Sequence, residues 1–209
     1  MITSKQAAEC VTKIYNPVDS GFFDKVVTDY GITFGLKTIG DTLVIATPGS
    51  QSNRDFYLDI KSISDCTILP NTGLVVDSFY RGLEHVVPLI MDDIEKAKKL
   101  AFTGHSLGCT RIIYLVNNLI NKGRKIETVH LFAPPLCTDI KTIKNIVLNT
   151  ERVCAFKNGS DPIVKLPGLL KYLAQFPLIK INESPGWLKR WIDINWHLMR
   201  LYTLGVNGL

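Results

Sequence analysis

Apolar runs of strand length alternate with stretches of helical periodicity through the middle of the chain. The strand-like runs read "KLAFTG", "ETVHLFA" and "RVCAFKNG", and helices are predicted between them over 107–121 and roughly 138–149. A strand, helix, strand order of this kind is typical of a parallel sheet covered by helices. We therefore predict an α/β fold with a mostly parallel central sheet and helices on both of its faces.

The first hundred residues add two helices and a hairpin to this pattern. Apolar residues recur at helical spacing over 3–16, where Pro17 ends the run, and a long helix is predicted around 77–98. In "ITFGLKTIGDTLVIATPG" two β-rich runs flank Gly-Asp, which predicts a hairpin whose continuously apolar second strand lies deep in the sheet. With 209 residues, 46% of them hydrophobic, the chain suits a single domain over 1–209.

Charge and cysteine content narrow the classes of partner and compartment. The formal net charge of +5 comes from scattered lysines and arginines, which argues against a nucleic-acid partner and leaves an anionic phospholipid interface open. The sequence has no apolar run of about 18 residues, so a transmembrane helix is not predicted. The amino terminus lacks a signal-peptide apolar region, and the five cysteines form no CxxC pair. A soluble protein of the cytoplasm is expected, with secretion or release by lysis left open.

The stretch "FTGHSLGCTR" contains the spacing Gly-x-Ser-x-Gly around Ser106. A nucleophilic serine has to present its hydroxyl at a sharp turn from strand to helix, and Gly104 and Gly108 avoid clashes there. A strand is predicted just before the motif and a helix just after it. The N–H of Leu107 then points to where an oxyanion would form. The plainer interpretation is a glycine and serine turn that only caps a helix.

A serine nucleophile needs a base, and four histidines are available. His85 lies in the helix before the motif, His130 lies within a strand, and His105 adjoins the serine and points elsewhere. In this architecture the acid and the histidine follow the serine along the chain. His197 is the candidate that remains, with a tryptophan-flanked helix histidine as the alternative.

Three aspartates compete for the role of orienting the histidine. Asp161 follows "RVCAFKNGS" at the carboxyl end of a predicted strand, and Asp139 follows "LFAPPLCT" one strand earlier. Both places suit the acid of a triad. Asp193, four residues before His197, fits a solvated helix charge better.

Three motifs in this order resemble the class 3 lipases, the fungal-type triacylglycerol lipases and related phospholipases A1 of the α/β-hydrolase fold. "FTGHSLG" is similar to that family's nucleophile elbow, and "KNGSDPIVKLP" to its acid segment, which favours Asp161 over Asp139. "VIATPGSQSNRDFYLDI" resembles the strand, turn and lid-bearing segment, although Pro48 stands where the family usually has arginine. The resemblance covers about residues 40–200.

The resemblance implies a set of roles for residues of this chain. Ser50 and the N–H of Leu107 would form the oxyanion hole, and Asp59 would help to orient Ser50. Ser106 would attack an ester carbonyl, His197 would act as base and then acid, and Asp161 would orient the imidazole. Neither a metal nor an organic cofactor is expected.

The substrate class depends on two further stretches. Phe56 and Tyr57 in "QSNRDFY" are candidates for a short lid, and Trp187 and Trp191, which share one helical face, for an acyl-binding wall or interfacial surface. The alternative is that these residues simply complete the core, which the tryptophans fit equally well. The expected function is hydrolysis of lipid esters by a lipase or phospholipase A1-like enzyme. A soluble short-chain esterase or thioesterase and a catalytically silent binding module are the alternatives.

Overall fold

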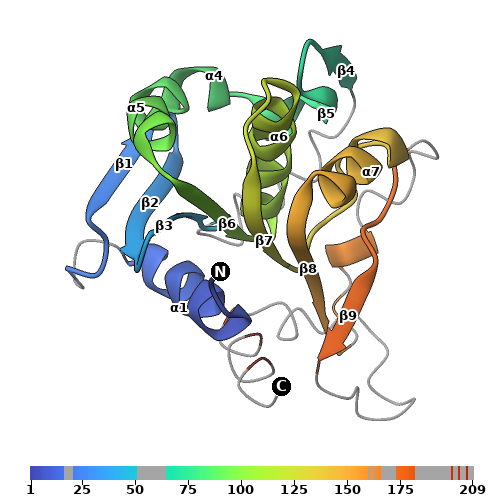
Figure 1. Ribbon diagram of the computed structural model, residues 1–209. Coiled ribbons are helices and arrows are strands. Elements are labelled where there is room, and N and C mark those ends of the chain that lie inside the picture. Colours follow the sequence, from blue (N-terminus) through green and yellow to red (C-terminus); the bar gives the residue numbers. More distant parts are fainter. Residues whose placement is uncertain are drawn as a thin grey trace.

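The protein folds around a seven-stranded sheet with the order β1-β2-β3-β6-β7-β8-β9 (Figure 1). This computed structural model describes residues 1–16, 21–50, 65–159, 161, 163–165, 173–181, 199, 202 and 206. β1, β2 and β3 pair antiparallel, and every pairing from β3 across to β9 is parallel. The predicted mostly parallel sheet is therefore confirmed. The strands are β1 Lys25–Asp29, β2 Ile32–Ile39, β3 Thr42–Thr47, β6 Lys99–His105, β7 Ile126–Phe132, β8 Thr150–Asn158 and β9 Leu178–Ile181.

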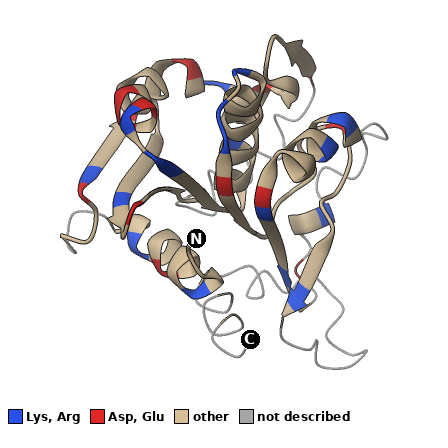
Figure 2. Ribbon diagram, viewed as in Figure 1, with Lys and Arg blue, Asp and Glu red and all other residues tan. Residues whose placement is uncertain are grey.

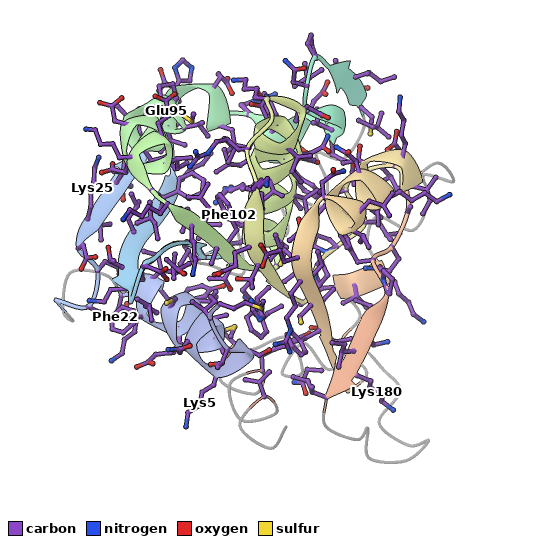
Figure 3. All side chains as sticks on the ribbon, viewed as in Figure 1. Lys5, Phe22, Lys25, Glu95, Phe102 and Lys180 are labelled. Atoms are coloured by element: carbon purple, nitrogen blue, oxygen red, sulfur yellow. The ribbon has the colours of Figure 1, made fainter. Side chains whose placement is uncertain are left out.

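Helices cover both faces of the sheet, as predicted. One apolar cluster fills the space between the sheet and α3 to α7, and a second lies between the sheet and α1, where the helical residues Met199, Tyr202 and Val206 join it. Figure 3 shows Phe102 of β6 inside the first cluster and Lys25 at the periphery. No helix in the described part of the chain is long and apolar enough to cross a membrane. The helices are α1 Ser4–Ile14, α3 Asp77–Tyr80, α4 Leu83–Val86, α5 Pro88–Lys96, α6 Leu107–Asn121, α7 Ile140–Leu148 and the 3₁₀ turn Ile163–Lys165.

Helix α1 forms where the periodicity predicts it. Thr3 and Gln6 form a capping box, in which each side chain satisfies a backbone N–H of the other residue. Ala7, Val11 and Ile14 are buried against the sheet, so the apolar face of this helix anchors the amino terminus to β3 and β6. Tyr15, directly after the helix, reaches the candidate site described below.

The predicted hairpin and its buried second strand are confirmed. β2 and β3 pair from Ile39 opposite Thr42 to Gly35 opposite Ala46, with Gly40 at φ +61° in the connecting turn. β3 then pairs in parallel with β6 and lies inside the sheet. The carboxyl ends of β3 and β6 consequently lie side by side, with Thr47 opposite Gly104.

The single long helix predicted around 77–98 is wrong, because the segment breaks into α3, α4 and α5. After α3 the backbone of Arg81 leaves the helical conformation with ψ 128°, and Gly82 then adopts the left-handed φ +90° before α4. Pro88 begins α5, and its missing N–H suits a first helical position. The strands β1 and β9 were not predicted either, nor was the small hairpin of β4 (Cys66–Leu69) and β5 (Gly73–Val76).

Candidate active site

Ser106 occupies a strained turn between the end of β6 and the start of α6. Its backbone has φ 53° and ψ −125°, a region that residues with side chains rarely adopt. The N–H of Ser106 donates to the carbonyl of Phe132 on β7 at 2.9 Å, which fixes the turn against the neighbouring strand. Such strain, of about 1 to 3 kcal/mol, persists only where the surroundings hold it, and it is the geometry of a nucleophile elbow.

Gly104 and Gly108 are required by close packing around this turn. A Cβ added to Gly104 would lie 2.7 Å from the carbonyl carbon of Gly108. A Cβ added to Gly108 would lie 2.5 Å from the backbone oxygen of Thr47 and 2.6 Å from that of Pro48. Because these neighbours are backbone atoms, they cannot move aside as the end of a flexible side chain could. The two glycines of the motif therefore let β6, α6 and the end of β3 meet at Ser106.

The loop after β3, Pro48–Ser50, runs directly past the serine and is called the β3 loop below. A Cβ added to Gly49 would lie 2.8 Å from the Cβ of Ser106, so only glycine allows this approach. Ser50 follows at a half-buried position, and the N–H of Leu107 belongs to the first turn of α6. The structure thus brings the β3 loop and the start of α6 together around one side of Ser106. Pro48, the departure from the family pattern, is buried in this contact.

Tyr15 connects the β3 loop to the residue before the serine. Its hydroxyl accepts a hydrogen bond from the N–H of Gly49 at 2.9 Å and lies 2.6 Å from Nδ1 of His105. The hydroxyl donates to Nδ1 or accepts from it according to the tautomer of His105. Burial raises the pKa of Tyr15 well above its usual range, so the hydroxyl stays protonated. These partners lie 34 and 90 residues away in sequence, so sequence analysis gave no signal for the role of Tyr15.

Asp161 lies just past the end of β8 and is completely buried. Its Oδ2 accepts from the hydroxyl of Tyr202 at 2.6 Å, and its Oδ1 accepts from the N–H of Ile163 at 2.9 Å. The Tyr202 hydroxyl also accepts from the N–H of Asn158 at 3.1 Å. Burial first, and then the charge of Asp161, raise the pKa of Tyr202 far above its ordinary value. The carboxylate is therefore held in a fixed orientation by neutral donors.

Aromatic contacts join the serine turn to the carboxylate. The ring of Tyr202 meets the ring of His105 edge-on at 5.6 Å between centroids and that of Phe132 at 6.0 Å. Phe132 in turn stacks on Phe156 at 5.1 Å. Since β6, β7 and β8 are parallel neighbours, their carboxyl ends reach the same edge of the sheet. Ser106 and Asp161 consequently lie at one edge, linked through Tyr202.

The histidines and the aspartate that the sequence left as alternatives have other surroundings. His85 stacks on Tyr30 at the surface with 4.1 Å between ring centroids. His130 is fully buried in β7, where burial and then the charge of Arg152 lower its pKa to about 4. Asp139 caps α7 by accepting from the N–H of Thr142 at 2.8 Å. These contacts and surroundings account for the positions of His85, His130 and Asp139 without a catalytic role beside Ser106.

Several predicted site residues lie outside the described part of the chain. They include the proposed base and the residue expected to orient Ser50. They also include the lid and acyl-wall candidates. These residues are Phe56, Tyr57, Asp59, Trp187, Trp191 and His197, and the alternative acid Asp193 lies outside that part as well.

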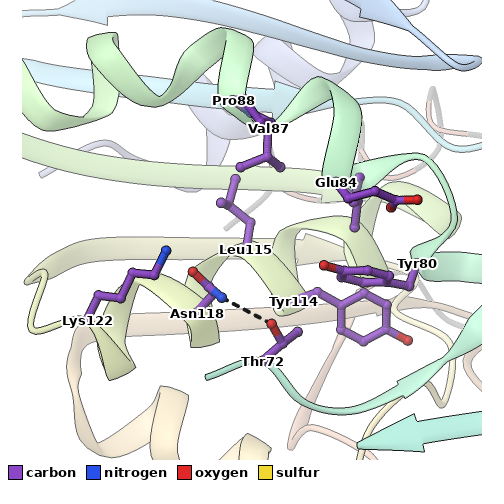
Figure 4. Close-up of a pocket in the computed structure, with 10 residues that line it drawn as sticks. Thr72, Tyr80, Glu84, Val87, Pro88, Tyr114, Leu115, Asn118 and Lys122 are labelled. Carbon is purple, nitrogen blue, oxygen red and sulfur yellow. Dashed lines mark hydrogen bonds between the residues drawn. The ribbon is translucent and has the colours of Figure 1, made fainter. Parts of the chain in front are cut away.

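A cavity of about 180 Å³ opens at the other end of α6 and is separate from this site (Figure 4). Its first lining residue on α6 is Tyr114, about 10 Å further along the helix axis than Leu107 at the usual helical rise. None of the predicted site residues within the described ranges lines it. The lining residues are Thr72, Tyr80, Leu83, Glu84, Val87, Pro88, Tyr114, Leu115, Asn118 and Lys122.

Solved structures of fungal lipases share this architecture. Lip2 lipase from Yarrowia lipolytica matches with a TM-score of 0.72 at 14% identity, over 94% of this chain and 91% of that one. The Rhizomucor miehei lipase in its propeptide complex matches with a TM-score of 0.69 at 16% identity, over 85% and 67%. The mono- and diacylglycerol lipase from Aspergillus oryzae matches with a TM-score of 0.67 at 18% identity, over 88% and 78%. These matches show the α/β-hydrolase fold.

Sequence comparison adds the family. No curated protein matches the chain significantly. The family model described as lipase (class 3) matches residues 44–171, which is more than half of the chain. The matched range includes Ser50, Ser106 and Asp161 and ends before His197. The resemblance noted in the motifs is thereby confirmed, and the chain belongs to the class 3 lipase family.

Proposed function

We propose that this protein is a serine hydrolase that cleaves carboxylic esters of lipids, with Ser106 as the nucleophile. The observation that carries the proposal is the strained backbone of Ser106 at the amino end of α6, which is held by the hydrogen bond to the carbonyl of Phe132. A turn that only caps a helix needs no such conformation, because an extended N-cap serves that purpose, as Thr3 does for α1. Membership of a lipase family supports esters as the substrate class and lipids as their source.

In the proposed reaction Ser106 Oγ attacks the ester carbonyl while His197 takes the hydroxyl proton. The tetrahedral oxyanion receives hydrogen bonds from the N–H of Leu107 and from Ser50. When the intermediate collapses, the bond from the carbonyl carbon to the alkoxy oxygen breaks, and His197 returns the proton to the leaving alcohol. Water, activated by the same histidine, then hydrolyses the acyl-enzyme. Asp161 stabilises the imidazolium and keeps it oriented, and no step requires a metal or an organic cofactor.

His197 is proposed as the base partly on its place in the chain. It precedes Tyr202 by five residues, and the hydroxyl of Tyr202 bonds to Asp161. The other three histidines have the separate partners or surroundings described above. The assignment of Asp161 as the acid is supported by its burial and by its two fixed hydrogen-bond donors. A solvated surface carboxylate has neither feature.

Tyr15 and Tyr202 are proposed as positioning residues in this machinery. Tyr15 holds the N–H of Gly49, so it sets how the β3 loop presents Ser50 to the oxyanion. Tyr202 holds the carboxylate that is to orient the histidine. Neither hydroxyl is proposed to touch substrate, and burial keeps both protonated.

The proposal is tested with p-nitrophenyl esters from acetate to palmitate and with a fluorophosphonate probe. Wild type should hydrolyse the series, with rates that rise with chain length, and the probe should label Ser106. Ser106→Ala should lose both properties, leaving only residual catalysis. Ser4→Ala, at the surface end of α1, is the matched control and should behave as wild type. A Ser106→Ala protein that folds and retains most of its activity would contradict the assignment, and a short-chain optimum would replace lipid esters by soluble ones.

A further inference from the structure

Helix α7 exposes an apolar surface that the proposed reaction does not use. Its buried side consists of Thr142, Ile143 and Ile146, which pack toward α6 and the sheet. The opposite side leaves large aliphatic side chains in solvent, with 53% of Ile140, 43% of Val147 and 82% of Leu148 exposed. We call the exposed residues of this helix the α7 outer face. They are Ile140, Lys141, Lys144, Val147 and Leu148.

The charge on the α7 outer face is entirely positive. Lys141 and Lys144 are both exposed, and the helix itself contains no acidic residue (Figure 2). Neither lysine takes part in an ion pair within the described part of the chain. Asp139 precedes the helix, but its carboxylate is engaged in capping it, and Glu151 follows on β8. The face thus combines aliphatic tips with two cations that have no counter-charge on the same helix.

These features select one kind of partner. A symmetric contact with a second copy would bring like charges together, because the lysines of both copies would meet. A specific protein interface is usually centred on aromatic or arginine anchors, and this face has neither. Aliphatic side chains flanked by lysines on one side of a helix are instead typical of helices that lie in a membrane interface.

We propose that the α7 outer face docks onto anionic phospholipid surfaces. The aliphatic tips would enter the boundary between headgroups and acyl chains, and the two lysines would pair with lipid phosphates. Helix α7 begins eight residues after β7, and its Asn145 donates to Asn117 and Asn121 in the second half of α6, so the face lies beside α6 and away from Ser106. The surface would hold the enzyme at its lipid phase independently of any contact made by residues around the catalytic serine.

The expected effects follow from the two kinds of contact. Each lysine near an anionic membrane contributes about 1 kcal/mol, or roughly fivefold in partitioning, so neutralising both should weaken binding about 30-fold. Replacing Val147 and Leu148 by serine removes the apolar contact and should weaken binding about tenfold or more. High salt should weaken wild-type binding because it screens the lysines.

The experiment is cosedimentation of the full chain with vesicles of phosphatidylcholine alone or with about one-third phosphatidylglycerol, at low and at about 0.5 M salt. The variants are Lys141→Gln with Lys144→Gln, and Val147→Ser with Leu148→Ser. The matched controls lie on or next to α5: Lys96→Gln with Lys98→Gln for charge, and Leu89→Ser for an exposed apolar side chain. Circular dichroism melting checks that each variant is folded.

The proposal predicts binding to the anionic vesicles, losses of the stated size in the α7 variants and control variants within about twofold of wild type. Equal binding by the α7 variants and wild type would overturn it, as would equal binding to both lipid compositions. A dimer seen by light scattering that Leu148→Ser dissociates would also overturn it and assign the face to a second copy. Hydrolysis of p-nitrophenyl acetate should not change in any α7 variant. Failure of the proposed nucleophile would appear in that assay alone, because vesicle binding is measured without turnover.

Discussion

Acid should destabilise this protein through His130, and a single substitution should remove that part of the effect. The imidazole has no exposed surface, and neither ring nitrogen has a hydrogen-bond partner among the described residues. Burial first, and then the charge of Arg152, lower its pKa from 6.5 to about 4. The folded state therefore accommodates the neutral ring and resists the protonated one.

The sign and size of the effect follow from the two pKa values of His130. In the unfolded chain the ring titrates near its ordinary value of 6.5, so between pH 6.5 and about 4 the unfolded state binds a proton that the folded state does not. The free energy of unfolding consequently falls as the pH is lowered through this window and levels off once both states hold the proton. A difference of this size corresponds to about 3 kcal/mol, a substantial part of the 5 to 15 kcal/mol typical of folded proteins.

The assay is urea unfolding followed by circular dichroism from about pH 7 to about pH 4. Wild type is compared with His130→Phe, which suits the aromatic neighbour Phe156, and with His130→Gln as a second variant. His85→Gln, at the surface, is the matched control. Other acidic groups titrate in all proteins, so the measured quantity is the difference from wild type. Wild type and His85→Gln should lose about 3 kcal/mol more than the His130 variants, and parallel pH curves for all four proteins would refute the reasoning.

Three further substitutions probe the architecture of the site. Tyr15→Phe leaves the N–H of Gly49 in the β3 loop without its acceptor, so kcat on p-nitrophenyl butyrate should fall about 10 to 100-fold with little change in KM. A variant with a lower free energy of unfolding but an unchanged kcat would limit Tyr15 to a structural role. Tyr202→Phe removes a donor to the buried carboxylate Asp161, and should lower the free energy of unfolding by about 1 to 3 kcal/mol and kcat/KM by about tenfold, measured by urea unfolding and initial rates. Gly108→Ala places a Cβ against the carbonyl of Thr47 at the end of β3, and should lower the free energy of unfolding by more than about 2 kcal/mol. The control is Gly123→Ala, where φ is +84° but no atom lies within 4 Å, and which should cost about half as much. Equal costs for the two alanines would contradict the packing argument.

The elements around Ser106 were predictable because their signals are local. The motif, the apolar strand before it and the amphipathic helix after it lie within residues 99–121, and the structure ends α6 at the predicted residue. The capping box of α1 and the turn of the β2–β3 hairpin are signals of the same kind. Each depends on residues within a few positions of one another, and tertiary packing did not change the structure that these residues favour locally.

The sequence was a poor guide where packing overrides periodicity. The segment from Asp77 to Lys96 has helical spacing, yet Gly82 and Pro88 divide it so that its pieces can bend around the end of α6. The edge strands β1 and β9 are short and half exposed, which weakens the alternation that reveals a strand. Their pairing with β2 and β8 completes them, and that contact is not encoded in their own residues.

The two tyrosines show why the arrangement of the site needed the structure. Tyr15 directly follows α1 and Tyr202 lies 187 positions later, yet both contact the ring of His105, one by a hydrogen bond and the other edge-on. Through that ring the loop after β3 and the carboxylate after β8 are braced against the same turn. Because Tyr15 and Tyr202 are 187 positions apart, the geometry around Ser106 depends on two distant segments packing on one face of the sheet. The site therefore becomes complete only when the whole fold is formed, which a local motif cannot reveal.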